Sequence, residues 1–351
     1  MSEPREIRVA ALLAWYDRAG RDLPWRVKKG RADPYRVWLS EVMLQQTTVA
    51  TASSYFNRFI TRWPTLGALA AATLDEVLAA WAGLGYYARA RNLHKCARLL
   101  AGKRGGEFPT TEADLRALPG IGRYTAAAIA AIAFGRPAVV VDGNVERVMA
   151  RLFCLTDPLP GAKPALYAHA AALTPRRRPG DYAQAVMDLG AILCTPRAPQ
   201  CSACPWAGSC LARARGMAAE LPRKSPKTAR PRRQAVAFWL ERDGPAGREV
   251  LLRRRPENGL LGGMLEVPSS PWIGEPCANP AAHAPVAADW RTLDRPVRHT
   301  FSHFHLELTV MTARYGDGPA QGTWYALDAL DRLALPTVMK KLARSVAGNT
   351  P

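Results

Sequence analysis

The sequence predicts a two-domain protein, with a mostly helical domain followed by a smaller α+β domain. Its 351 residues are enough for two hydrophobic cores. Apolar residues recur with helical spacing through residue 215, whereas beyond residue 234 they alternate as in strands. Residues 216–233 are basic, contain prolines and have little apolar content, as expected of a linker. We therefore assign the domains to residues 1–215 and 234–351.

The composition favours a nucleic-acid partner. Lysine and arginine total 48 against 29 acidic residues, a net charge of +19. Such an excess indicates a polyanion, although an arginine-rich, high-GC genome explains part of it. The sequence has no apolar run of membrane-spanning length, and residues 1–18 lack the pattern of a secretory signal. We expect a cytoplasmic protein that does not bind membranes.

One glutamate stands out in the helical domain. Asp33 and Pro34 supply an N-cap and a first-turn proline for a helix expected to run to Thr47. Glu41 lies within the apolar stretch 37–44, where a carboxyl group should have a raised pKa and suit a proton donor. The ordinary alternative, a solvated glutamate on a helix face, is weakened because this stretch has no polar face.

The segment Pro119-Gly120-Ile121-Gly122 separates two helical patterns and predicts a tight hairpin. The second helix should begin near Arg123, so its free N–H groups and positive dipole end form an anion site. A DNA phosphate could lie on the amides of Gly120 and Gly122. An ordinary helical connection is equally compatible with the hairpin, but the Asp142-Gly-Asn144 sequence after it favours DNA binding.

A second glycine turn, Gly83–Gly85, carries Leu84 and is followed by Tyr86 beside two arginines. An apolar wedge flanked by cations can enter a base stack while the cations hold phosphates. The alternative is a pair of core aromatic residues at a helix start.

Four cysteines form one short loop at residues 194–210. They are Cys194, Cys201, Cys204 and Cys210, with the spacing Cys-x6-Cys-x2-Cys-x5-Cys. Four thiolates in one short loop can hold a cubane iron–sulfur cluster, and a four-cysteine zinc site is the chemical alternative.

The second domain carries a glycine-rich segment at 259–268 that resembles the start of a Nudix-type domain. The clustered carboxylates of a Nudix hydrolase do not follow it, so we expect a binding module without pyrophosphatase activity. Its strongest feature is the segment 299–306, whose hydroxyl, imidazole and aromatic groups can contact a base and its phosphate. A histidine-rich strand end that binds metal or is merely exposed is the alternative.

Taken together, these motifs resemble the MutY-type adenine DNA glycosylases. This family combines a helix–hairpin–helix domain of the endonuclease III superfamily with a C-terminal Nudix-like domain. The resemblance covers nearly the whole chain and implies a mostly α glycosylase domain with a [4Fe–4S] loop. It implies base excision repair, in which base flipping brings adenine mispaired with 8-oxoguanine, or with guanine, into the active site. The partner would be double-stranded DNA enclosed by the two domains, and we expect a monomer associated with a bacterial nucleoid.

The resemblance also implies roles for individual residues. Glu41 would protonate adenine at N7, Asp142 would stabilise the sugar cation, and Tyr124 and Asn144 would position them, in the manner of paired carboxylates in glycoside hydrolysis. Asp142 also fits a helix N-cap. The adenine pocket matches Arg21, Trp25 and Gln184, although the segment between Trp25 and Pro34 is longer than in the family. The residues matching contacts to 8-oxoguanine and DNA are Gln46, Thr47, Leu84, Tyr86, Gly120, Gly122, Phe301, Ser302 and His303.

Three other functions are alternatives for this sequence. An endonuclease III-type glycosylase/lyase acting on oxidised pyrimidines resembles the first half equally well, but uses a lysine where this chain has Tyr124, and a phenol cannot form an imine. A non-enzymatic iron–sulfur DNA-binding protein would leave Glu41 and Asp142 without a purpose. A Nudix hydrolase of oxidised nucleotides lacks the required carboxylates.

Overall fold

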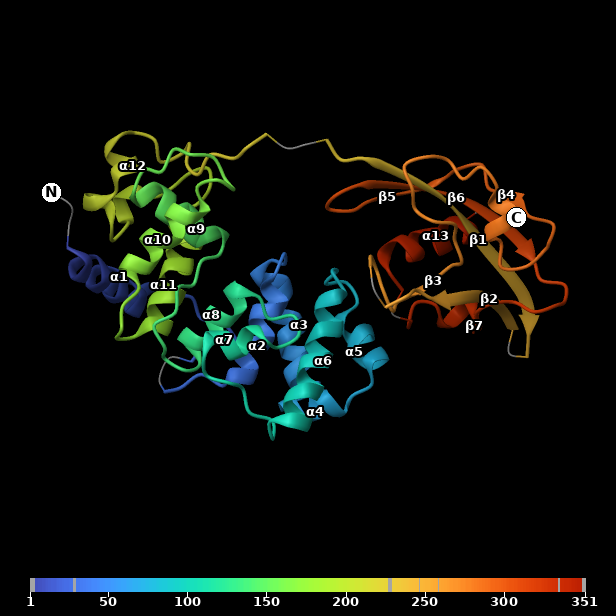
Figure 1. The fold of residues 1–351 in the computed structure, drawn as a ribbon, viewed down its shortest axis with the longest axis horizontal. Coiled ribbons are helices and arrows are strands. Elements are labelled where there is room, and N and C mark those ends of the chain that lie inside the picture. The colour runs from blue at the N-terminus through green and yellow to red at the C-terminus, as the bar shows by residue number, and fades with distance from the viewer. Residues whose placement is uncertain are drawn as a thin grey trace. The chain divides into compact units, whose positions relative to one another are not determined.

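The computed structural model describes residues 4–27, 30–226, 229–245, 247–257, 259–333 and 335–348. Its contacts divide the chain into two units (Figure 1), namely Met1–Ala72 with Asn92–Lys227, and Thr73–Arg91 with Thr228–Pro351. The first unit is helical and the second contains the sheet, so the fold class predicted from the sequence is confirmed. Among the described residues, no helix has the length and apolar character needed to cross a membrane.

The helices of the first unit are short and are joined by tight connections. They are α1 (Arg5–Ala19), α2 (Pro34–Leu44), α3 (Val49–Arg62), α4 (Leu66–Ala71), α6 (Ala88–Lys103, from Asn92 onward), α7 (Glu112–Arg116), α8 (Arg123–Ile132), α9 (Gly143–Leu152), α10 (Lys163–Leu173), α11 (Pro179–Ile192) and α12 (Leu211–Ala214).

Helix α11 is the central element of one hydrophobic core, and it packs against α1, α8 and α9. Every position of α11 from Tyr182 to Gly190 is buried, as is Pro179 in its first turn. Gly190 allows a close approach, since a Cβ atom there would lie 2.6 Å from the Cβ of Asn144 on α9. The glycine therefore brings α11 directly against the helix that carries Asn144.

Side-chain caps set the starts of two helices at the site. The Asp33 side chain accepts a hydrogen bond from the Tyr35 amide at 2.9 Å, and Pro34 occupies the first turn, as predicted. Asp142 caps α9 by accepting from the Val145 amide at 2.7 Å. The helix containing Glu41 ends at Leu44, three residues before the predicted Thr47.

The second unit is built on a seven-stranded sheet with the strand order β3-β2-β1-β6-β4, while β5 pairs with β6 and β7 with β2. Its central pair is parallel, with Arg232 opposite His305. The elements are α5 (Leu74–Trp81), β1 (Arg232–Gly244), β2 (Gly247–Arg254), β3 (Leu265–Glu266), β4 (Arg291–Thr292), β5 (Val297–Thr300), β6 (His305–Arg314), β7 (Thr323–Ala326) and α13 (Thr337–Ala347).

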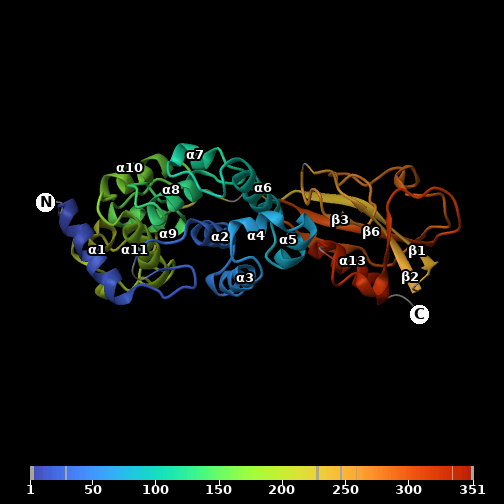
Figure 2. The same cartoon turned by 90° about the horizontal axis from the view of Figure 1, so that it is seen from below.

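Both faces of the central strand β1 are covered. Ala235, Ala237 and Trp239 share a core with α13, which packs on the sheet (Figure 2). The alternate residue Phe238 meets Trp290 edge-on, with ring centroids 5.2 Å apart. Helix α13 begins only at Thr337, because the chain is still extended at Pro336.

Candidate active site

The first unit contains a cavity of about 700 Å³ that both predicted catalytic carboxylates line. Glu41 comes from α2 and Asp142 from the loop before α9, 101 positions later in the chain. Further lining residues from the sequence prediction are Arg21, Trp25, Gln46, Thr47, Tyr124, Asn144 and Gln184. The fold therefore brings together, around one cavity, residues from five separate parts of the sequence.

Glu41 is buried, with 4% of its surface exposed. Burial, with a smaller contribution from the nearby Asp142, raises the pKa of its carboxyl group to about 7, although Tyr124 and Arg26 oppose the shift. Its Oε2 atom has no hydrogen-bond partner among the described residues. The predicted environment of a neutral acid is thus present, since about half of such groups carry a proton at neutral pH.

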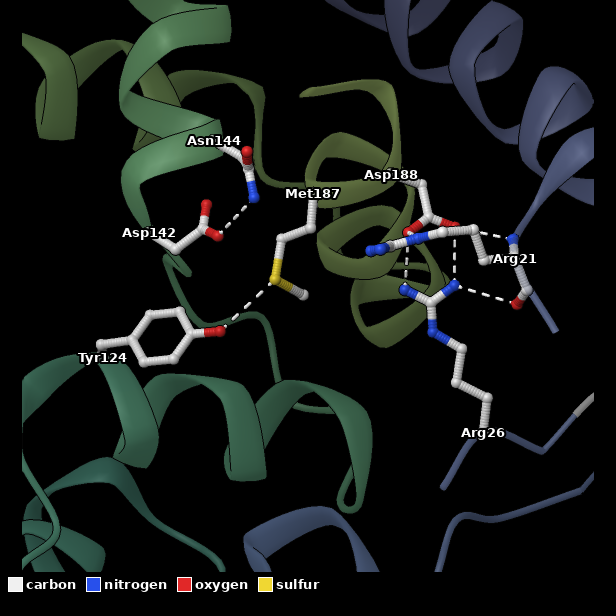
Figure 3. A network of polar contacts seen from close by, with 7 residues as sticks. All are labelled: Arg21, Arg26, Tyr124, Asp142, Asn144, Met187 and Asp188. Carbon is white, nitrogen blue, oxygen red and sulfur yellow. Dashed lines mark hydrogen bonds and ion pairs between the residues drawn. The ribbon is translucent and has the colours of Figure 1, made fainter. Parts of the chain in front are cut away.

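Asp142 has a different environment from Glu41. Burial raises the pKa of its carboxyl group, but hydrogen bonds from Val145 and Asn144 and the charge of Arg147 favour the carboxylate. The Asn144 amide donates to Asp142 Oδ2 at 3.0 Å (Figure 3). Asp142 is the N-cap of α9, as predicted, and it also lines the cavity.

Tyr124 lies in the first turn of α8 and points into the same space. Its hydroxyl donates to Met187 Sδ at 3.4 Å and lies close enough to Glu41 to stabilise the carboxylate of that residue. Burial and the two carboxyl groups raise the pKa of Tyr124 well above its usual value, so its hydroxyl stays protonated. A neutral hydroxyl here can donate a hydrogen bond but cannot act as a base.

The predicted adenine-pocket residues form another part of the wall. Trp25 is buried and meets Phe56 edge-on at 5.4 Å. Gln184 is buried on α11, where its amide donates to the Gly180 carbonyl at 3.3 Å. Arg21 also lines the cavity, and its Nε donates to Asp188 at 2.7 Å. The longer segment after Trp25 therefore does not displace these residues from the site.

Two residues of the site were not predicted from the sequence: Arg26 lines this wall, and Asp188 binds Arg26 without lining the cavity itself. Asp188 is fully buried on α11 and binds both nitrogens of the Arg26 guanidinium, at 2.6 and 2.8 Å. A signal was available, because Asp188 interrupts the apolar run Val186–Leu189 just as Glu41 interrupts its own. The partner of a buried acid, however, cannot be read from the residues around it.

The predicted hairpin connects α7 to α8. Gly120 has a φ of +75°, and a Cβ atom there would lie 2.6 Å from the Cβ of Asn92, so a glycine is required. Gly122 is the N-cap of α8 and makes no side-chain cap, and a Cβ atom added to it would meet open space. The amide end of α8 is thus accessible, as an anion site requires.

In the second unit, the residues predicted to contact 8-oxoguanine lie at the turn between two strands and at a glycine turn. Phe301 stacks on Phe304 at 4.7 Å between β5 and β6, while Ser302 and His303 are exposed. The Tyr86 hydroxyl is 2.6 Å from Ser302 Oγ, and Tyr86 is 51% exposed. Leu84, predicted to be a wedge, is only 6% exposed and belongs to the core in this conformation.

The four cysteines Cys194, Cys201, Cys204 and Cys210 line one small cavity of about 30 Å³. Burial raises the pKa of the Cys204 thiol to about 11 and also raises that of Cys210, while hydrogen bonds from backbone amides partly oppose both shifts. No group of three histidine, cysteine or acidic side chains in the described ranges is arranged to hold a single metal ion. Four thiols around one enclosed space fit a polynuclear cluster, which would cross-link this loop.

Two arginines of α9 hold the cysteine loop. Arg151, 1% exposed, donates to Cys194 Sγ at 3.3 Å and to the carbonyl groups of Thr195 and Pro196. Arg147 donates to the Cys194 carbonyl at 2.7 Å and to Asn144 Oδ1 at 2.8 Å. A continuous chain of hydrogen bonds therefore connects the cysteine loop to Asp142.

Comparison with known families agrees with this geometry. Residues 39–165 match the HhH-GPD superfamily of base excision DNA repair proteins, residues 194–210 the iron–sulfur binding domain of endonuclease III, and residues 236–345 the NUDIX domain. The predicted [4Fe–4S] cofactor and Nudix-like domain are thereby confirmed.

The chain is also similar to individual proteins. It is 37% identical to the human adenine DNA glycosylase, over 97% of this chain and 74% of that protein. It is 42% identical to the Mycobacterium tuberculosis adenine DNA glycosylase, over 58% and 66% of the two chains. A thermostable thymine-DNA glycosylase superposes with a TM-score of 0.54 at 29% identity, covering 60% of this chain and 97% of the other. An endonuclease III in a non-covalent DNA complex gives 0.52 at 26% identity, covering 62% and 99%.

The hairpin, the two carboxylates in one cavity, the cysteine loop and these similarities lead to one conclusion: the chain belongs to the adenine DNA glycosylases, enzymes that hydrolyse N-glycosyl bonds.

Proposed function

We propose that this protein is a monofunctional glycosylase that removes adenine paired with 8-oxoguanine, or with guanine, from double-stranded DNA in base excision repair. The observation that carries the proposal is the pair of carboxylates around one cavity, with a pKa of about 7 for Glu41. Adenine leaves poorly as an anion, so its departure requires a proton near neutral pH.

The proposed reaction uses these groups in sequence. Glu41 donates its proton to adenine N7 while the C1′–N9 bond breaks and its electron pair moves to the base. Asp142, held by Asn144, stabilises the positive charge left on the sugar, and Tyr124 orients Glu41. Water then adds to C1′ and loses a proton, which restores the acid on Glu41.

Substrate recognition would involve both units. A flipped adenine would enter the cavity between Arg21, Trp25 and Gln184. DNA phosphates would bind the open amides at Gly120 and Gly122. The residues proposed to recognise 8-oxoguanine are Gln46, Thr47, Leu84, Tyr86, Phe301, Ser302 and His303.

The domain assignment remains part of this proposal, with a glycosylase domain at 1–215, a linker at 216–233 and a recognition domain at 234–351. The structure adds that Leu221 is 2% exposed and packs with Ala212 and Cys154, and that the Leu159 amide donates to the Arg223 carbonyl. A truncation intended to isolate the glycosylase domain should therefore end at Pro226 so that these contacts remain. We also propose that the protein acts as a monomer.

The decisive experiment is a base-release assay on duplexes that pair 8-oxoguanine with each of the four bases. Adenine alone should be released, and Glu41→Gln and Asp142→Asn should each reduce its release by two orders of magnitude or more. Release of an oxidised pyrimidine, or full activity of both variants, would refute the proposal.

Borohydride trapping separates this function from that of a glycosylase/lyase. Because Tyr124 occupies the position of the lysine nucleophile, an efficient covalent adduct with DNA is not expected. Efficient trapping together with strand cleavage as fast as base release would contradict a monofunctional enzyme.

A further inference from the structure

Asp188 holds two arginines of the cavity wall from behind. Its carboxylate accepts from Arg26 at 2.6 and 2.8 Å, from Arg21 Nε at 2.7 Å and from the Arg21 amide at 2.9 Å (Figure 3). Burial by itself would raise the pKa of Asp188, but the bonds from Arg26 and Arg21 outweigh it and hold the pKa below its usual value. Asp188 is therefore an anion with all its acceptor positions engaged.

Arg26 is hydrogen-bonded to the carboxylate of Asp188 and acts electrostatically on the carboxyl group of Glu41. Its side chain is 8% exposed, it lines the same cavity as Glu41, and its charge acts on the Glu41 carboxyl group. The Arg26 guanidinium also lies over the ring of Tyr16 on α1, 5.8 Å from the ring centroid. Of the two acids near Arg26, Asp188 is fully bonded, whereas Glu41 Oε2 has no partner among the described residues.

If Arg26 were released from Asp188, pairing with the Glu41 carboxylate would be energetically favourable. Burying a guanidinium without a hydrogen-bond partner costs free energy, and a bidentate hydrogen bond to a carboxylate offsets this cost most strongly. The other groups facing Glu41 are Tyr124 from α8 and Asp142 before α9, and neither carries a positive charge. An Arg26–Glu41 ion pair would keep Glu41 ionised and remove its proton.

We propose that Asp188 is a positioning residue that binds Arg26 against α11 and so prevents this arginine from pairing with Glu41. The arrangement keeps the Arg26 guanidinium in the cavity wall while Glu41 retains its proton. The inference rests on the proposed role of Glu41 as the proton donor.

The test is the pH dependence of single-turnover adenine release by the full-length protein. In the unmodified enzyme the rate should fall as pH rises through about 7, because Glu41 loses its proton. In Asp188→Asn this fall should move to lower pH by roughly one to three units, the effect of an adjacent arginine on a carboxyl group. Above pH 7, the rate of adenine release by Asp188→Asn should be about tenfold lower for each pH unit by which the fall is displaced.

Three further variants make the result specific. Asp188→Glu retains the ion pair and should leave the position of the fall near that of the unmodified enzyme. Arg26→Gln removes the cation and should move the fall to higher pH. The double variant of Asp188→Asn with Arg26→Gln should reverse the downward displacement, since no arginine remains to pair with Glu41.

A purely structural role for Asp188 would lower the rate equally at every pH, and that result in Asp188→Asn would overturn the inference. If Asp188→Asn does not fold, Arg26→Gln decides the matter, and an unmoved profile overturns it. Glu41→Gln distinguishes a failure of the proposed function from a failure of the inference about Asp188. Normal adenine release by this variant refutes the proposed function, whereas an inactive Glu41→Gln with an unmoved Asp188→Asn profile refutes only the inference.

Discussion

Replacing Glu41 by glutamine should stabilise the folded protein at alkaline pH while it abolishes catalysis. The substitution keeps the shape of the side chain and removes only its titration. The pKa of Glu41 is raised by burial from 4.5 to about 7. Between pH 4.5 and pH 7, Glu41 binds a proton in the folded chain but not in the unfolded chain. The contribution of Glu41 to the free energy of unfolding is therefore fully present below pH 4.5 and is lost as pH rises through 7.

The magnitude follows from the size of the pKa difference. Each unit corresponds to about 1.4 kcal/mol, so ionising Glu41 costs about 3 kcal/mol at pH 8 and less than about 1 kcal/mol at pH 5. Glutamine avoids this cost. Burying the uncharged glutamine changes the free energy of unfolding equally at both pH values. The stability of the variant relative to the unmodified protein should therefore be about 2 to 3 kcal/mol greater at pH 8 than at pH 5, which corresponds to roughly 4 to 12 °C in melting temperature.

The assay is thermal unfolding followed by circular dichroism at pH 5 and pH 8. Glu6→Gln on α1, where the side chain is exposed, is the matched control, and its effect should be the same at both pH values. An equal effect of Glu41→Gln at pH 5 and pH 8 would mean that Glu41 is already ionised at pH 7. In that case it could not serve as the acid.

Three other perturbations test the rest of the site. Gly120→Ala should destabilise the protein by about 1 to 3 kcal/mol and weaken DNA binding in fluorescence anisotropy, because its φ is +75° and the new Cβ would clash with Asn92. Arg151→Met should speed the loss of the cluster's visible absorbance in the presence of a chelator, because the substitution removes the hydrogen-bond donor of several carbonyl groups in the cysteine loop. An unchanged rate would show that the loop keeps its conformation without Arg151. Ser302→Ala should reduce the preference for 8-oxoguanine over guanine by about fivefold, the value of one hydrogen bond, and Tyr86→Phe should add little to it if the two hydroxyl groups act together.

The local features of the site were predictable because each depends on a few neighbouring residues. The cap at Asp33, the start of α8 at Arg123 and the raised pKa of Glu41 all follow from residues within one or two helical turns. The boundaries were less exact. Helix α2 ends at Leu44 rather than Thr47, since apolar residues alone do not indicate where the chain leaves the core.

Asp188 shows where this kind of prediction stops. Its sequence surroundings are as apolar as those of Glu41, yet the two carboxyl groups have opposite pKa shifts. The difference is the partner, because Asp188 meets two arginines and Glu41 meets none that binds it. The same residue type in the same local pattern is thus an anion in one place and an acid in the other.

By itself the sequence determined which chemical groups are available, where the helices α2 and α8 begin, and that four cysteines share one loop, because these properties depend on short-range spacing. Only the tertiary structure decided that Glu41 and Asp142 line one cavity, and that Arg26 is bound by a residue 162 positions away. Such contacts arise from the packing of whole helices, which the close approach at Gly190 helps to set, and no local pattern encodes that packing.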